Sequence, residues 1–206
     1  MLPWGLLALS TMGTLGILLG VVVLLAFFGV GIYNRLVTLH NRIDNAFSQI
    51  EVQLKRRYDL IPNLVETAKG YMKHEKETLK MVIDARNAAN EAAKTASGDP
   101  SDQNAIKGLQ ESEQKLQGAM MNFQALAEGY PDLKANTNML ALQEELATTE
   151  NKVGFSRQAF NDAVMQYNTG IEMFPNSLIA NQFKFTQATE WQIEDQEARK
   201  NVKVTF

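Results

Sequence analysis

The chain contains no cysteine and only two histidines, His40 and His74. The absence of cysteine excludes disulfides, thiolate zinc sites, iron–sulfur clusters and a cysteine nucleophile. Neither histidine has the Glu-x-x-His spacing that two-metal sites in helical bundles use. Neither has an evident acid that would orient it for Ser-His-Asp catalysis. We therefore expect no cofactor, no metal ion and no enzymatic activity.

Charge is absent from the start of the sequence, where the first charged side chain is Arg35. Residues 6–33 form an apolar run in which nothing is more polar than Ser10, Thr11 and Thr14. A hydrocarbon core about 30 Å thick needs about 20 apolar helical residues, so this run can span a membrane. It is longer than the apolar part of a signal peptide and lacks the basic residues that precede one. The sequence predicts a retained transmembrane helix.

Positive charges flank only the C-terminal side of this run, at Arg35, at Arg42 and in residues 55–57. Because positively charged loops stay in the cytoplasm, this asymmetry predicts an outside N-terminus and a cytoplasmic domain. The formal net charge of the chain is −3 and its pI is about 5.5. A nucleic-acid binder would carry a basic face, so this balance argues against nucleic acid as a partner.

Small residues recur within the apolar run, at Gly13, Gly16 and Gly20. Such a face allows close packing of helices in a membrane, and we predict that these glycines contact another transmembrane helix. The alternative is that glycine is simply frequent in membrane helices.

Beyond residue 33, apolar residues recur every three or four positions, which indicates amphipathic helices. Pro62 is the first break, because the residue before a proline is biased away from helical geometry. We expect the first helix to end near Asp59 or Leu60 and Pro62 to open the next. The pattern predicts helices over about residues 34–60, 62–94, 103–128 and 136–174. Short connections between them favour an antiparallel four-helix bundle.

The expected architecture is therefore all-α. Residues 1–33 hold the N-terminal tail and transmembrane helix, which continues into a bundle over residues 34–175. A short C-terminal tail covers residues 176–206. In it, Val202, Val204 and Phe206 alternate with polar residues, which predicts a strand-like contact with another chain. The alternatives are disorder and docking of the tail on its own bundle.

Lys55, Arg56 and Arg57 form the densest basic cluster. One interpretation is contact with anionic lipid headgroups or with a neighbouring subunit. The alternative is a solvated cluster near a helix C-terminus, where the helix dipole favours positive charge.

Several polar residues lie on or beside the apolar stripes of the predicted helices. We predict a buried polar network in which carboxylates pair with Arg86 or Arg157 or accept hydrogen bonds from amides. Its proposed members are Asn63, Glu66, Glu150 and Asn161.

The run from Ala46 to Val65, AFSQIEVQLKRRYDLIPNLV, resembles the LemA family of bacterial membrane proteins. Tyr33–Val37 is similar to the same family, and the likeness covers nearly the whole chain. Further similar segments are Ala85-Arg86, Leu142–Leu146, Thr149–Asn151, Tyr167-Asn168, Phe174-Pro175 and the closing Val-x-Val-x-Phe. The chain departs from the family pattern at Phe47 and Phe160, where Trp and Tyr are expected. The resemblance implies one N-terminal transmembrane helix, a cytosolic four-helix bundle and a place in the bacterial inner membrane. It implies no catalytic residues.

We expect a non-enzymatic membrane protein that forms homo-oligomers. Bundles fixed at one end to the lipid bilayer would pack side by side and so organise or shape the membrane. The alternative is an adaptor that presents its bundle to a cytoplasmic or membrane partner protein.

Overall fold

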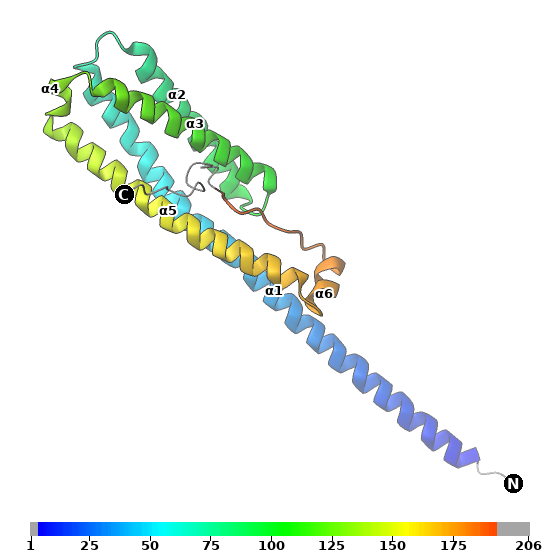
Figure 1. The fold of residues 1–206 in the computed structure, drawn as a ribbon. Coiled ribbons are helices and arrows are strands. Elements are labelled where there is room, and N and C mark those ends of the chain that lie inside the picture. The colour runs from blue at the N-terminus through cyan, green and yellow to red at the C-terminus, as the bar shows by residue number, and fades with distance from the viewer. Residues whose placement is uncertain (1–3, 193–206) are drawn as a thin grey trace, which may run out of the picture.

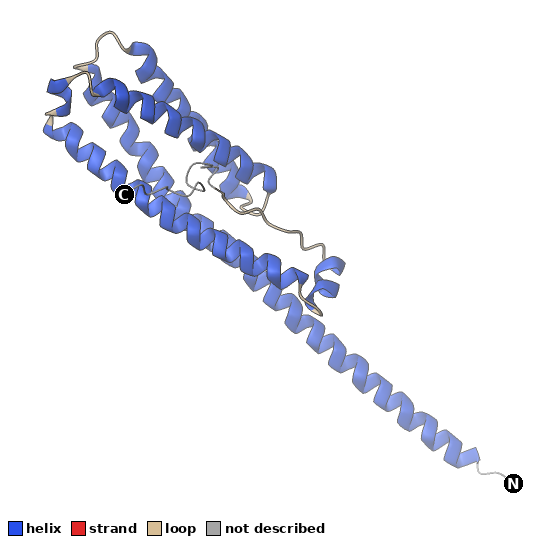
Figure 2. Ribbon diagram, in the orientation of Figure 1, coloured by secondary structure: helices blue, strands red, loops and turns tan. Residues whose placement is uncertain are grey.

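The computed structural model describes residues 4–192, with the side chains of residues 13–192. Over this range the chain is helical and contains no strand, so the all-α prediction is confirmed (Figures 1 and 2). The helices are α1 (Trp4–Lys69), α2 (Lys76–Gly98), α3 (Gln103–Ala127), α4 (Pro131–Lys134), α5 (Thr137–Glu172) and α6 (Asn176–Gln182).

The N-terminal half of α1 projects alone beyond the other helices, which gather around its C-terminal half (Figure 1). Its large apolar side chains from Leu15 to Val30 are 45–72% exposed. From Ile32 onward one face of the helix is buried. Within the described residues, α1 is the one helix long and apolar enough to cross a membrane. The prediction of a long apolar N-terminal helix is confirmed.

The predicted break at Pro62 is wrong. α1 passes through Pro62 without interruption and ends at Lys69, and α2 begins only at Lys76. A proline inside a helix removes one N–H donor, here the one that would bond the carbonyl of Tyr58. Arg86 of α2 replaces it, with its Nε donating to that carbonyl oxygen at 2.8 Å. The helix therefore survives its proline because another helix satisfies the freed carbonyl.

The body of the molecule is held by pairwise helix packing. α5 lies along α1, and α2 lies along both α1 and α3. Phe47 of α1 and Phe160 of α5 meet edge to face with ring centroids 5.8 Å apart. Gly170 lets α5 approach α1 closely, because a Cβ there would lie 2.6 Å from Leu39 Cδ1. Since α3 packs mainly on α2 and α5 mainly on α1, a space is left between α3 and α5.

After α5 the chain turns back on itself. α6 packs against α1 and α5, and residues 185–192, which we call the strap, then run without regular structure beside α5. Ala188 and Trp191 of the strap are buried, with Trp191 only 4% exposed. The described part of the predicted tail is therefore packed into the body. Val202, Val204 and Phe206 lie outside the described residues.

Candidate functional site

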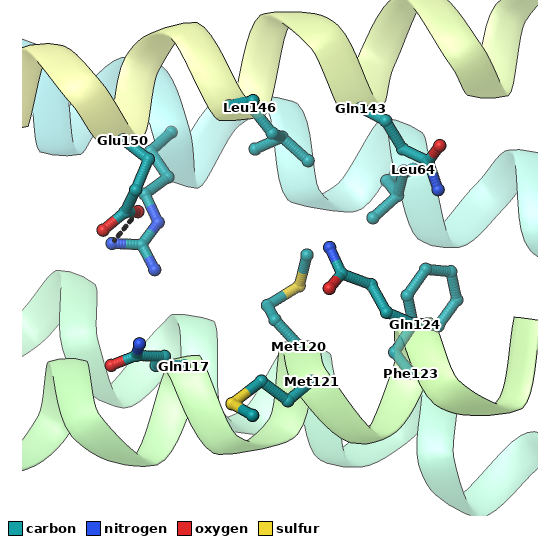
Figure 3. Close-up of a pocket in the computed structure, with 11 residues that line it drawn as sticks. Leu64, Gln117, Met120, Met121, Phe123, Gln124, Gln143, Leu146 and Glu150 are labelled. Carbon is teal, nitrogen blue, oxygen red and sulfur yellow. Dashed lines mark ion pairs between the residues drawn. The ribbon is translucent and has the colours of Figure 1, made fainter. Parts of the chain in front are cut away.

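A groove of about 260 Å³ lies between α3 and α5. Figure 3 shows α5 along one side, α3 along the other and α1 behind them. The lining residues are Gln117, Met120, Met121, Phe123 and Gln124 of α3, Gln143, Leu146, Ala147 and Glu150 of α5, and Arg57 and Leu64 of α1.

The lining combines an apolar surface with amide side chains. Met120 points across the middle of the groove toward Leu146, whereas the side chain of Met121 lies along α3 and points away from α5 (Figure 3). Methionine is unbranched and adapts to differently shaped neighbours, which suits a variable ligand. Gln117 and Gln124 lie on the α3 side, and each amide can both donate and accept a hydrogen bond. This combination suits a peptide, whose side chains are often apolar and whose backbone needs donors and acceptors.

A buried ionic network closes one end of the groove. Arg57 of α1 is 7% exposed, and its Nη1 lies 2.7 Å from Glu113 Oε2 and 3.1 Å from Glu150 Oε2. The dashed line in Figure 3 marks the pair with Glu150. The hydroxyl of Tyr58 donates to the other oxygen of Glu113. Burial, together with the charge of Glu113, raises the pKa of Tyr58, so the hydroxyl stays protonated. The network ties α1, α3 and α5 together.

Arg157 of α5 interacts electrostatically with the same two carboxylates, those of Glu150 and Glu113. Its pKa is lowered by burial and raised by the negative charges of Glu150 and Glu113, and burial is the larger effect. Two arginines therefore balance two glutamates at this end of the groove, which gives an ion no net charge to bind. Within residues 13–192, no three His, Asp or Glu side chains gather closely enough to hold a metal ion.

The strap lies against α5 near Asn161 and Asn168, which follow the groove residues 143–150 in the sequence. It is bound through its backbone. Asn168 Nδ2 donates to the carbonyl of Ala188 at 2.9 Å, and the Ala188 N–H donates to Asn168 Oδ1 at 2.9 Å. Asn161 binds the N–H and the carbonyl of Trp191 in the same way, at 2.8 and 3.0 Å. From α3, Gln110 Nε2 donates to the carbonyl of Glu190 at 3.0 Å. The helices thus bind an extended chain by amide side chains that pair with its peptide groups.

The predicted glycine face is open in this chain. A Cβ added to Gly13, Gly16 or Gly20 would find nothing within 4 Å. Contact of this face with another membrane helix remains a prediction.

The predicted basic cluster does not form one surface. Lys55 is exposed, Arg56 pairs with Glu145 of α5, and Arg57 is buried in the network described above. Arg57 therefore does not face lipid or a neighbouring subunit, because it lies on the apolar stripe of α1 beside Leu54 and Tyr58.

The four residues predicted as a buried network do not form one. Asn63 is exposed, and Glu66 is exposed and pairs with its neighbour Lys69. Both lie opposite the buried face of α1, which continues past Pro62. Glu150 does pair with a buried arginine, but its side chain is 58% exposed. Asn161 binds the strap instead.

The sequence analysis did not identify Glu113, which is the buried carboxylate of the ionic network. The signal for it was its position, because Glu113 fills the one gap in the apolar stripe of α3. That stripe consists of Ile106, Leu109, Leu116, Met120 and Phe123. A charged residue at a core position requires a partner, and here the partner is Arg57.

Comparisons with known proteins identify relatives of this chain. The chain is 28% identical over 154 residues to Protein LemA of Metamycoplasma hominis, a match that covers 75% of this chain and 66% of that protein. It is 24% identical over 166 residues to the magnetosome protein MamQ of Magnetospirillum gryphiswaldense, covering 72% of this chain and 60% of MamQ. The chain therefore spans 66% of the length of the first relative and 60% of the length of the second. The sequence model of the LemA family matches residues 46–206, which include the groove and the strap. The chain belongs to the LemA family.

Proposed function

We propose that this protein is a non-enzymatic, membrane-anchored adaptor whose α3–α5 groove binds an extended segment of a partner protein. One observation carries the proposal. Asn161, Asn168 and Gln110 already hold a segment of chain by its peptide groups, and a groove lined by further amides lies farther along the same two helices.

Two features support the membrane anchor. The projecting half of α1 exposes apolar side chains that would be costly to leave in water. α6 packs beside the end of this apolar segment, where Ile179 Cδ1 would lie 3.6 Å from a Cβ on Gly29. It carries Leu178 outward at 61% exposure, and Phe174 and Phe183 on either side of α6 are 80% and 57% exposed. Such a patch fits the boundary between lipid and water. The anchor would lie in the bacterial inner membrane with the body in the cytoplasm, as the flanking charges favour.

The groove supports binding of a peptide rather than of an ion or a small metabolite. Its charged end is balanced, and its middle is apolar and rich in methionine. A peptide could place aliphatic side chains on Met120, Met121 and Leu146 while the surrounding glutamines pair with its backbone. This mode selects for an extended apolar segment more than for one sequence.

The test is site-directed photo-crosslinking in cells that make the full-length protein. A photoreactive amino acid at Met121, which is 62% exposed in the groove, should capture one dominant partner protein. The matched control is Met165, which is 53% exposed on α5 outside the groove. Leu146→Glu, which places a charge in the apolar middle of the groove, should weaken capture at Met121. Equal capture at both positions, or no capture, would contradict the adaptor function.

The membrane anchor has its own test, because the chain contains no cysteine. A fluorophore on Leu178→Cys or Val22→Cys should be quenched by lipids that carry a nitroxide near the headgroup or in the acyl chain, respectively. Leu140→Cys, 50% exposed at the far end of α5, is the control and should not be quenched. If Val22→Cys is insensitive to both lipids, α1 is not a membrane helix.

A second candidate function is self-assembly that organises or shapes the membrane. It is favoured by the unbroken α1, which couples the apolar segment to the body, and by the open face of Gly13, Gly16 and Gly20. Electron microscopy of the full-length protein in particles of native lipid would test it. Rings, cages or lattices would support assembly, whereas single monomers at cellular concentration would contradict it.

A further inference from the structure

We infer that the far end of α1 and the start of α2 form a second docking surface, which binds an acidic amphipathic helix of a partner protein. A groove of about 670 Å³ lies between the two helices there. Four lysines and four apolar residues line it, and we call it the lysine groove. Its volume lies in the range of about 300–1,000 Å³ that is typical of ligand sites. None of its residues lines the α3–α5 groove, so the inference goes beyond the proposed function and does not depend on it.

The charges that line this groove all have the same sign. They are those of Lys69, Lys73, Lys76 and Lys80, all exposed, and no acidic residue lines the groove. Lys69 and Lys80 pair with exposed acids on their own helices, and exposed pairs of this kind contribute little. Within residues 13–192, Lys73 and Lys76 form no ion pair. The groove therefore attracts an anionic ligand.

The acid nearest to these lysines in the sequence, Glu75, is used elsewhere. It lies between Lys73 and Lys76, but its carboxylate accepts a hydrogen bond of 3.1 Å from the hydroxyl of Tyr130. It does not cap α2, which begins at Lys76 without a side-chain cap. Positive charge at the start of a helix opposes the helix dipole. The stability of α2 therefore does not account for Lys76.

Between the lysines the groove is apolar. Val65, Met72, Leu79 and Ile83 complete its lining. The first three are 1–5% exposed, and Ile83 is half-buried. The stems of the lysines are aliphatic as well, and only their ends carry charge. A ligand that carried charge alone would leave this apolar lining unused. The groove suits a ligand whose apolar side chains are flanked by carboxylates.

The spacing of the lining residues fits a helix. Leu79 and Ile83 are four residues apart on α2, and so are Lys76 and Lys80. Each pair therefore repeats after about one helical turn, or about 6 Å. An amphipathic helix repeats its apolar and its charged face at the same interval. A partner helix lying along α2 would place leucines on the apolar pair and carboxylates on the lysine pair.

The position of the groove favours a protein over a lipid. Lys69 lies about 54 Å beyond Tyr33 along the unbroken α1. The groove is at the end of the molecule opposite to the projecting half of α1 (Figure 1). A bilayer around that half would not reach it. The formal net charge of −3 argues against nucleic acid. A protein segment is an anionic ligand that also supplies apolar side chains.

Fluorescence anisotropy tests the inference on the full-length protein in phosphatidylglycerol nanodiscs, with empty discs as the background. The probe is a labelled helical peptide with leucines on one face and glutamates beside them. Lys73→Glu with Lys76→Glu should weaken its binding by about tenfold or more. The control, Lys94→Glu with Lys107→Glu, makes the same change in net charge at exposed positions outside the groove. It should leave the affinity almost unchanged. Equal weakening by the two double variants would overturn the inference.

Competitors identify the chemistry that the groove recognises. A peptide with glutamines in place of the leucines should bind about tenfold more weakly to the unchanged protein. Equal binding of the two peptides would show attraction by charge alone and would overturn the inference. Displacement of the probe by an oligonucleotide of equal charge, or by added phosphatidylglycerol vesicles, would also overturn it, because the groove would then bind anions of any kind.

A photoreactive leucine in the probe locates the binding site. Its links should fall within residues 65–83 and should be lost in Lys73→Glu with Lys76→Glu. Links mainly to Met121 would place the peptide in the α3–α5 groove, which would overturn this inference and support the proposed function. Links within residues 65–83, together with no partner capture at Met121 in cells, would support the inference and contradict the proposed function.

Discussion

Arg86 Nε donates a hydrogen bond of 2.8 Å to the carbonyl oxygen of Tyr58, one helical turn before Pro62. This is the carbonyl that the proline leaves without its usual N–H. The Arg86 side chain is 20% exposed and also lies 3.6 Å from Asp59. A contact from α2 therefore keeps α1 continuous from its apolar half to its far end at Lys69.

The first prediction is energetic coupling between Arg86 and Pro62. Arg86→Ala should lower the free energy of unfolding by about 1–3 kcal/mol, because a buried carbonyl loses its donor. In a Pro62→Ala background the alanine N–H can bond the same carbonyl, so the same change should cost about 1 kcal/mol less. Urea unfolding of the full-length protein in detergent, followed by circular dichroism, measures the four free energies.

The control for this double-mutant cycle is Lys94→Ala, a change at an exposed position of α2, the helix that carries Arg86. It should not couple to Pro62→Ala. If Arg86→Ala costs the same with and without the proline, the Arg86 hydrogen bond does not compensate for Pro62.

The second prediction concerns the buried pair of Arg57 and Glu113. Glu113→Leu should cost about 3–5 kcal/mol, because Arg57 would stay buried with only the exposed Glu150 as its partner. The double change Arg57→Met with Glu113→Leu should recover much of that loss, since hydrophobic residues of similar volume replace a buried pair at little cost. The same unfolding measurement reports both values.

The exposed pair of Lys80 and Asp84 provides the comparison. Asp84→Ala should change the free energy of unfolding by less than about 0.5 kcal/mol. A cost for Glu113→Leu no larger than this would show that Glu113 is not a buried partner of Arg57.

Sequence periodicity predicted the parts of the fold that depend on neighbouring residues. α3 and α5 begin and end within a few residues of the predicted limits, because Asp102 and Asn136 cap their N-termini and Pro175 stops the second. The end of α1 could not be predicted this way. Whether Pro62 breaks the helix depends on Arg86, which reaches it from another helix.

The candidate site was harder to predict from the sequence than the fold. Glu113 interrupts an apolar stripe and so gave a local signal, but its partner Arg57 stood in a basic cluster that suggested a surface. The strap carries no helical or strand periodicity. Its partners Asn161 and Asn168 became meaningful only once the fold placed an extended chain beside them.

The third prediction is an alkaline loss of stability that depends on Tyr58. Burial raises the pKa of Tyr58 in the folded chain above the value near 10 of an exposed tyrosine. Above that pH the unfolded chain has lost a proton that the folded chain keeps, so stability is full below about pH 10 and falls as the pH rises further.

Tyr58→Phe tests this directly. This change removes the titratable hydroxyl and should reduce the loss of stability at alkaline pH. At neutral pH it should lower the free energy of unfolding by about 1 kcal/mol, because Glu113 loses a hydrogen-bond donor. Part of the decline should remain, since burial also raises the pKa of Tyr167. Free energies of unfolding are measured for both proteins from neutral pH to well above about pH 10, and they give the slope of stability against pH for each protein. Equal slopes in the two proteins would show that Tyr58 does not titrate with unfolding.

The fourth prediction concerns the pairing of Asn161 with Trp191. An aspartate at this position accepts hydrogen bonds but cannot donate, so Asn161→Asp would place a carboxylate against the Trp191 carbonyl. We expect the strap to detach locally and the indole, now 4% exposed, to become accessible to water. The chain has two tryptophans, so a Trp4→Phe background leaves Trp191 as the single reporter. Its emission should shift to the red and its quenching by acrylamide should increase.

Asn122→Asp, an exposed change on α3, should leave both unchanged. Asn168→Asp should have a smaller effect on the fluorescence, because it releases Ala188 rather than Trp191. If Asn161→Asp leaves the emission and the quenching of Trp191 as they were, the asparagine contacts do not hold the strap against α5.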